Sequence, residues 1–313
     1  MTLVAPFFDD VAEAPKFAQA HWLKSNDGVR IRIAHWHHET TSKGTILIFP
    51  GRTEYIEKYG RCISEFEKNG FATLVIDWRG QGLSDRLTSD HMLGHVGDYS
   101  EYQLDVQATI EHAETLNLPK PYFLIGHSMG GCIALRAILN SLPVKAAAFS
   151  APMWGIHISP ILRPFAWGLS TISKVLRFSD TYAPKQTNKA LVISHPFDGN
   201  PLTTHPNSFD YMRRQLKAHP ELSLGGASLG WLNSSLIEIK KLSRLPPPDI
   251  PFLAFLGTDE SIVEPAPIQN LVQQSAHGRL LMFDDAKHEI LMEKPEHRDR
   301  AIDALTTFFT EQT

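Results

Sequence analysis

The stretch YFLIGHSMGG (Tyr122–Gly131) decides the fold of this chain. Its first half has the composition of a buried strand, and the residues from Met129 onward have that of a helix. Between them, Gly126, Ser128 and Gly130 form the pattern G-x-S-x-G, in which small residues permit a sharp strand-to-helix turn. We expect Ser128 to adopt a strained backbone conformation that exposes its hydroxyl. The alternative is a chance match in a glycine-rich turn, which the strand–turn–helix setting disfavours.

Outward from this stretch, short apolar runs alternate with longer amphipathic stretches. This alternation predicts an α/β fold with a mainly parallel sheet, whose strands are buried on both faces. The Asp27-Gly28 turn predicts a hairpin between the first two strands. The later expected strands are Thr45–Phe49, Ala72–Asp77, Tyr122–Gly126, Ala146–Ser150, Phe252–Gly257 and Leu280–Asp284, and the expected helices are Tyr55–Asn69, Ser100–Leu116, Met129–Asn140, Pro267–Ala276 and one from Pro295.

The alternation stops between residues 152 and 245 and resumes near Ile250. We interpret residues 152–245 as a cap inserted into a discontinuous core made of residues 1–151 and 246–313, with three consecutive prolines as a stiff return linker. The cap holds eleven basic and five acidic side chains, a net charge of +6, which leaves −10 for the core. A basic, aromatic-rich cap favours anionic membranes or phosphate-bearing substrates. Scattered surface charge is an equally good interpretation.

A nucleophilic serine needs a base, and the base needs a carboxylate that orients it. In this architecture the acid and then the histidine follow the serine along the chain. Asp259 comes directly after the strand Phe252–Gly257, and His288 comes after Leu280–Asp284. Both therefore lie where parallel strands end and ligand sites form. We predict Ser128, Asp259 and His288 as the catalytic residues. The rivals are Asp284 and Asp285 for the acid, and His127, His277 and His297 for the base.

Two backbone N–H groups should stabilise the oxyanion of such a reaction. One belongs to Met129, which follows the serine at the start of a helix. The other belongs to Arg52, in the loop after the strand Thr45–Phe49. Because the N–H acts, the Arg52 side chain is free to hold a phosphate or to pair with Glu54. A surface salt bridge is the plainer interpretation of that side chain.

Composition and motifs exclude several other functions. The chain is 42% hydrophobic and 20% charged, as in ordinary globular proteins. A net charge of −4 gives no basic field for nucleic acid. His35 and His37 share a strand face, but without further ligands we interpret them as surface residues and not as a metal site. No phosphate loop or dinucleotide fingerprint is present. We expect neither a cofactor nor a metal.

The two cysteines form no disulfide or zinc pattern, which favours a reducing compartment. The acidic N-terminal residues lack the basic start of a secretory signal, and no apolar stretch is long and unbroken enough to span a bilayer. We therefore expect a cytoplasmic protein, with peripheral contact to the inner face of the membrane through the cap.

Segments spread over nearly the whole chain have the pattern of a known family. They are PGRTEYIEKY (Pro50–Tyr59), DWRGQGLSDR (Asp77–Arg86), GHV (Gly94–Val96), GHSMGG (Gly126–Gly131), SAPMWGI (Ser150–Ile156) and HEILMEK (His288–Lys294), with LTTHPNSFDYMRR (Leu202–Arg214) and LGGASLGW (Leu224–Trp231) in the cap. Together they resemble the motifs of the α/β-hydrolase superfamily, in particular its monoacylglycerol-lipase-like serine hydrolases and the bacterial lysophospholipases among them. One departure from the wider superfamily is Pro50-Gly51, where His-Gly is common; the lysophospholipase-like members share it.

The resemblance implies an α/β-hydrolase fold with a mostly parallel eight-stranded sheet and an inserted cap. It also implies Ser128, Asp259 and His288 as catalytic residues and Arg52 and Met129 as oxyanion donors. The expected activity is hydrolysis of a lysophospholipid ester; the alternatives are a monoacylglycerol lipase, a general carboxylesterase, or a silent lipid-binding protein. Candidate residues for lining an acyl tunnel, or for packing the cap's own core, are Trp154, Phe165, Trp167 and Trp231.

Overall fold

One sheet of nine strands organises residues 3–313, the part of the chain that the computed structural model describes. The strand order is β1-β2-β3-β5-β4-β6-β7-β8-β9. The strands from β4 to β9 pair in parallel, whereas β1, β2 and β3 run antiparallel to their neighbours. The strands are β1 (Leu3–Val4), β2 (Gln19–Lys24), β3 (Arg30–Trp36), β4 (Thr45–Phe49), β5 (Ala72–Asp77), β6 (Tyr122–His127), β7 (Ala146–Ser150), β8 (Phe252–Gly257) and β9 (Gly278–Phe283).

The predicted fold class and hairpin are confirmed, with one strand more than expected. The additional strand is the two-residue β1, which pairs with β2 at the edge of the sheet and is too short to be recognised from its residues. The helices are α1 (Asp9–Ala12), η1 (Ile56–Tyr59), α2 (Gly60–Lys68), α3 (Glu101–Thr115), α4 (Met129–Leu139), α5 (Arg163–Val175), α6 (Leu191–Ser194), α7 (Pro206–Ala218), η2 (Pro220–Leu222), α8 (Leu229–Leu242), α9 (Pro265–Gln274), η3 (Ile290–Met292) and α10 (Pro295–Thr310).

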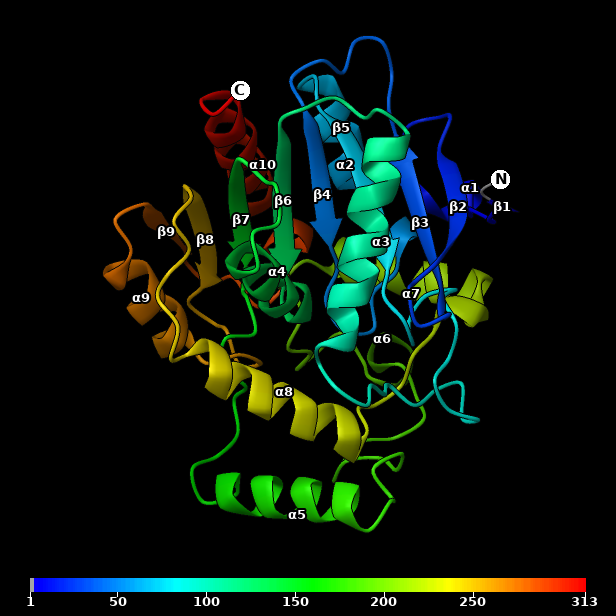
Figure 1. Cartoon of the computed structure of the whole chain (residues 1–313), viewed down its shortest axis with the longest axis vertical. Helices are drawn as coiled ribbons and strands as arrows, with labels where there is room; N and C mark the ends of the chain where they lie inside the picture. Colours follow the sequence, from blue (N-terminus) through cyan, green and yellow to red (C-terminus); the bar gives the residue numbers. More distant parts are fainter. Residues whose placement is uncertain (1–2) are drawn as a thin grey trace.

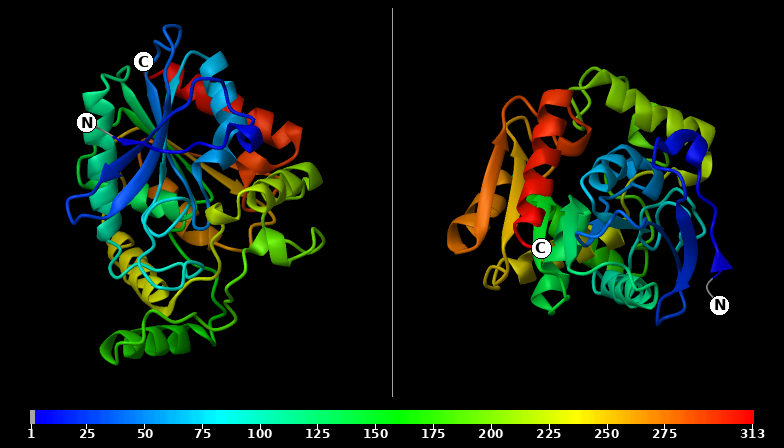
Figure 2. Two further views of the ribbon diagram at one scale, coloured as in Figure 1. Left: turned by 90° about the vertical axis from the view of Figure 1, so that its right-hand side faces the viewer. Right: turned by 90° about the horizontal axis from the view of Figure 1, so that it is seen from above.

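Helices cover both faces of the sheet, because successive strand residues point to opposite sides. In β4, Ile46 and Ile48 face α2 and α10, whereas Leu47 and Phe49 face α3 and α4. Figure 2 shows these two helical layers with the sheet between them. The parallel strands are therefore apolar at nearly every position, which is the feature that identified them in the sequence.

The residues between β7 and β8 lie outside the sheet, beyond the C-terminal ends of its parallel strands (Figure 1). Helices α5 and α8 pack side by side there, and Asn233 of α8 donates hydrogen bonds to Ser170 and Thr171 of α5. Helix α7 instead packs against the body of the protein, where the Tyr211 hydroxyl donates to the Ala12 carbonyl at 2.6 Å. The segment between β7 and β8 therefore contacts the rest of the chain at several places, among them Tyr211 in α7 and Gly225, whose carbonyl accepts from Arg52.

The sheet brings the ends of β4 and β6 together, which are distant in the sequence. Strand β4 lies between β5 and β6 in the sheet. The chain passes from β4 to β5 on one side and then crosses to β6 on the other side of β4. This is a topological switch point, where open α/β sheets place their ligand sites. Beside it, β8 and β9 end on the same edge. The loops after β4, β6, β8 and β9 thus converge.

His35 is buried, contrary to our interpretation of it as a surface residue, whereas His37 is exposed beyond the end of β3. The ring of His35 stacks on that of His21, which lies beside His112 of α3. Within residues 3–313, His35 Nδ1 and His112 Nε2 are buried without a hydrogen-bond partner. Burial, reinforced by the neighbouring histidines, lowers the pKa of His35 to about 4.

We predict that this histidine cluster makes the fold sensitive to acid. The unfolded chain binds a proton at His35 near pH 6.5, whereas the folded chain binds it near pH 4. Stability from His35 is therefore complete above pH 6.5 and is lost as the pH falls toward 4, by about 2 kcal/mol between pH 7 and pH 5. Urea unfolding at these two pH values should show that His35→Leu removes about this much of the pH dependence. The exposed His37→Leu serves as the control, and an equal effect of both changes would contradict the prediction.

Candidate active site

Ser128 lies in the sharp turn between β6 and α4, with φ 49° and ψ −117°. Its N–H donates to the Ser150 carbonyl at 3.0 Å, which fixes the turn against β7. A Cβ at Gly130 would lie 2.0 Å from the Phe49 carbonyl oxygen, and one at Gly126 would lie 2.9 Å from the Cβ of Ala134. These close approaches explain why the pattern requires glycine on both sides of the serine.

His288 and Glu260 form a short hydrogen bond next to this turn. The Nδ1 of His288 lies 2.6 Å from Glu260 Oε2, and both side chains are almost fully buried. The other Glu260 oxygen accepts from the N–H groups of Ile262 at 2.6 Å and Val263 at 3.1 Å. Burial alone would raise the pKa of Glu260, but the hydrogen bond and charge of His288 and these N–H groups hold it below its ordinary value.

Asp259 does not fill the place that the sequence analysis gave it. Its side chain is exposed, and the carboxylate that contacts His288 is that of the next residue, Glu260. Two backbone hydrogen bonds explain the difference: Thr258 donates to the Phe283 carbonyl at 2.9 Å and Asp259 to that of Ala286 at 3.0 Å. They fix the loop with residue 259 facing outward. The sequence offered both carboxylates side by side, and only the loop backbone distinguishes them.

Ser128 and His288 line one cavity of about 790 Å³. Among the described residues the Ser128 hydroxyl has no hydrogen-bond partner, His288 included; such bonds are often long without substrate. Of the four aromatic residues proposed as tunnel lining, Phe165 and Trp231 face the cavity. Trp154 packs instead on Phe149 in the core. The other cavity-wall side chains are largely apolar and come from both the core and the insertion, among them Met153, Ile156, Leu169, Leu191, Met212, Leu216, Leu224 and Ile262.

The loop after β4 holds a free N–H between two that are bound. The Gly51 N–H donates to the Glu54 carboxylate, and the Thr53 N–H donates to Gln81 Oε1 at 3.0 Å. In the part of the chain that the structure describes, the N–H of Arg52 has no acceptor. Met129 is the first residue of α4, so its N–H has no partner inside the helix. Both N–H groups are thus available to an oxyanion.

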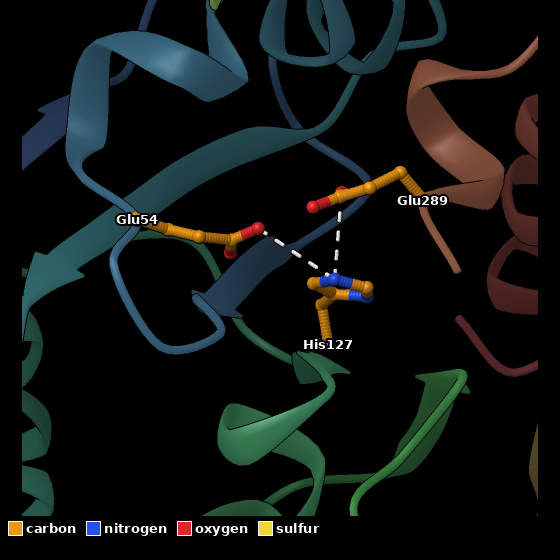
Figure 3. A group of neighbouring side chains, drawn as sticks. All are labelled: Glu54, His127 and Glu289. Carbon is orange, nitrogen blue, oxygen red and sulfur yellow. Dashed lines mark ion pairs between the residues drawn. The ribbon is translucent and has the colours of Figure 1, made fainter. Parts of the chain in front are cut away.

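A buried charge cluster joins three of these loops (Figure 3). Lys58 contacts the carboxylates of Glu54 and Glu289, the latter at 2.7 Å. His127 Nε2 lies 3.6 Å from Glu54 and 3.4 Å from Glu289, and its Nδ1 donates to the Ser150 carbonyl at 3.0 Å. Burial alone would lower the pKa of His127, but the two carboxylates raise it. The cluster ties the Arg52 loop to the residues adjacent to Ser128 and His288.

This cluster was missed in the sequence because its members come from three separate segments, around Glu54, His127 and Glu289. Glu54, His127 and Glu289 bring one ligand atom each within 4.8 Å of one another, a spacing at which a metal could be held. The Lys58 ammonium group already contacts both carboxylates, however, and its pKa is raised because Glu289 and Glu54 outweigh the effect of burial. The Lys58 ammonium group therefore compensates charge on both carboxylates.

The parallel sheet, the serine turn at its switch point and the histidine after its last strand define the class of the protein, which is an α/β-hydrolase. Residues 40–295 match the family described as serine aminopeptidase, S33, and the chain belongs to this family.

Similar proteins extend over almost the whole chain. A probable lysophospholipase L2 of Haemophilus influenzae is 26% identical and covers 98% of this chain and 99% of its own length. Lysophospholipase L2 of Escherichia coli is 30% identical, and the match covers 89% of this chain and 83% of the relative. The solved structure of a soluble monoglyceride lipase variant from Saccharomyces cerevisiae has a TM-score of 0.72 at 18% identity, covering 93% and 94%. The chain is accordingly a carboxylic ester hydrolase.

Proposed function

We propose that this protein hydrolyses the acyl ester of lysophospholipids with Ser128, His288 and Glu260 as its triad. The hydrogen bond of 2.6 Å between His288 and Glu260, beside the strained Ser128, carries this proposal. The likeness to two lysophospholipases over most of the chain supports the substrate class. Monoacylglycerol is the second candidate substrate, supported by the likeness to a monoglyceride lipase fold.

The proposed reaction begins with transfer of the Ser128 proton to His288 Nε2, since Nδ1 faces Glu260. The Ser128 oxygen attacks the ester carbonyl, and the N–H groups of Arg52 and Met129 stabilise the oxyanion. His288 then protonates the departing glycerol oxygen, which leaves an acyl-enzyme. Water, deprotonated by His288, attacks this ester and releases the fatty acid and Ser128. Glu260 stabilises the protonated imidazole in both halves.

A panel of substrates with one acyl chain tests the substrate class. We expect lysophosphatidylcholine to be hydrolysed with a higher kcat/KM than a monoacylglycerol of the same chain, by about tenfold or more if phosphate contacts assist. Released fatty acid gives the rate for both. Preference for monoacylglycerol would favour the second candidate, and turnover of neither would contradict both.

We also propose that residues 152–245 act as a cap whose helix α5 contacts an anionic membrane. Within residues 3–313, no helix has both the length and the apolar character needed to cross a bilayer. Helix α5 and its flanks expose a row of apolar side chains at helical spacing, with Ile161 88% and Val175 75% exposed. Exposed basic residues lie in the neighbouring helix α8 (Lys240 and Lys241) and just after its end (Arg244). Leu162 and Phe165 both belong to this row and line the cavity, which supports direct entry of an acyl chain.

Sedimentation with phosphatidylglycerol vesicles tests this contact. The double change Ile172→Asp and Val175→Asp should weaken binding by about tenfold or more, because two apolar side chains are lost from the contact and two charges oppose anionic lipid. Phe17→Asp is the control, at an apolar residue outside α5 that is more exposed than either Ile172 or Val175. Binding that is absent in the wild type, or indifferent to salt, would contradict the proposal.

A further inference from the structure

The guanidinium group of Arg52 lies in the wall of the active-site cavity and has most of its donors free. Its Nη1 donates to the Gly225 carbonyl at 2.9 Å, and its Cζ lies 5.5 Å from the ring centroid of Trp231. Within residues 3–313, no carboxylate lies within 4.0 Å of it, and one of its five N–H donors is used. The expected salt bridge between the side chains of Arg52 and Glu54 is therefore not formed, because Glu54 is held by Lys58.

Partial burial without a counter-ion is costly for a guanidinium, and the loss of solvent lowers the pKa of Arg52 to about 10. The group remains charged near neutral pH. A half-buried cation with free donors gains most from an anion that can accept several hydrogen bonds. The two carboxylates in the cavity wall, Glu54 and Glu289, do not supply this anion because Lys58 contacts both.

Two further cations lie at the rim of the same cavity. The Gly226 N–H donates to the Thr187 carbonyl at 2.7 Å, so the segment around Thr187 lies against the residues that hold Arg52. Lys185 and Lys189 flank Thr187, line the cavity and are exposed. Neither forms an ion pair with any residue that the structure describes. This side of the cavity is therefore positive from its rim to Arg52.

We infer that Arg52 forms a phosphate-binding subsite for the head group of the substrate, which deepens the proposed lysophospholipase function and rests on it. The backbone N–H of Arg52 is available to the ester oxyanion, and its side chain extends from the same residue. In a lysophospholipid, only the glycerol backbone separates the ester from the phosphate. One residue thus contacts both ends of that unit, while Lys185 and Lys189 attract the anion at the rim.

The test compares one neutral and one phosphate-bearing substrate in Arg52→Met. Lysophosphatidylcholine and monoacylglycerol with the same acyl chain are assayed, and the ratio of their kcat/KM values is the readout. Any damage to the oxyanion donor or the fold lowers both rates together and leaves the ratio unchanged. We expect the ratio to fall by about tenfold to a hundredfold. Arg52→Lys, which keeps the charge without the fork of donors, should recover part of this loss.

Lys145→Met removes the same charge from an exposed residue just before β7, at the ends of the strands opposite the active site. This change should leave the ratio unchanged. An unchanged ratio in Arg52→Met, with a wild type that hydrolyses lysophosphatidylcholine, would overturn the subsite but not the proposed function. Inhibition of monoacylglycerol hydrolysis by inorganic phosphate, relieved in Arg52→Met, would support a subsite that also takes free phosphate. A changed ratio without such inhibition would support one that binds phosphate only within the lipid.

Discussion

Replacement of Ser128 by alanine is expected to lower kcat for ester hydrolysis by about four to six orders of magnitude. The hydroxyl is the proposed nucleophile, and no neighbouring group of the cavity can take over covalent catalysis at the same position. The residual rate would come from the oxyanion donors and from substrate binding alone. Release of fatty acid measures the loss, and a fluorophosphonate probe should no longer label the protein.

Ser150→Ala is the matched control for this change. Ser150 is buried at the end of the adjacent strand, where it pairs in register with His127, and its hydroxyl has no hydrogen-bond partner among the described residues. Its removal should leave kcat within a few-fold of the wild type. Near-normal activity in Ser128→Ala, or probe labelling that persists there, would contradict the assignment of the nucleophile.

The fold was predictable because its strongest signals are local. Continuous apolar runs such as Thr45–Phe49 and Tyr122–Gly126 can be buried on both faces only in a parallel sheet covered by helices. The glycines around Ser128 required a turn that brings backbone atoms into contact, and the observed distances at Gly126 and Gly130 agree. These features depend on a few neighbouring residues, so the sequence displays them directly.

The features that were missed depend on contacts across the fold. His35 reads as a surface residue in its own strand, but His21 and His112 cover it from β2 and α3. Charged and polar side chains such as these are usually solvated, yet four of them form a buried cluster beside the site: Lys58, Glu54, His127 and Glu289. Charge compensation of this kind requires the three-dimensional neighbours of each residue, which no spacing rule supplies.

Replacement of Glu260 by glutamine is the second large expected effect, a decrease in kcat of about three to four orders of magnitude. Glutamine keeps the length of the side chain, and its amide oxygen can still accept from the N–H groups of Ile262 and Val263. Its NH₂ group then faces His288 Nδ1, which must become an acceptor. The histidine proton moves to Nε2, the nitrogen that has to accept the Ser128 proton. The change therefore leaves the loop in place and puts the imidazole in an unproductive tautomer.

Asp259→Asn, one residue earlier in the same loop, separates the two interpretations of this acidic pair. Its side chain is exposed, so kcat should stay within about threefold of the wild type, as is usual when a change touches neither the core nor the reacting groups. A large loss of kcat in Asp259→Asn together with an active Glu260→Gln would contradict the assignment of Glu260. It would support Asp259, the acid predicted from the sequence. The outcome depends on one physical condition, which is that a carboxylate must contact Nδ1 to hold the proton away from Nε2. Glu260 meets this condition at 2.6 Å.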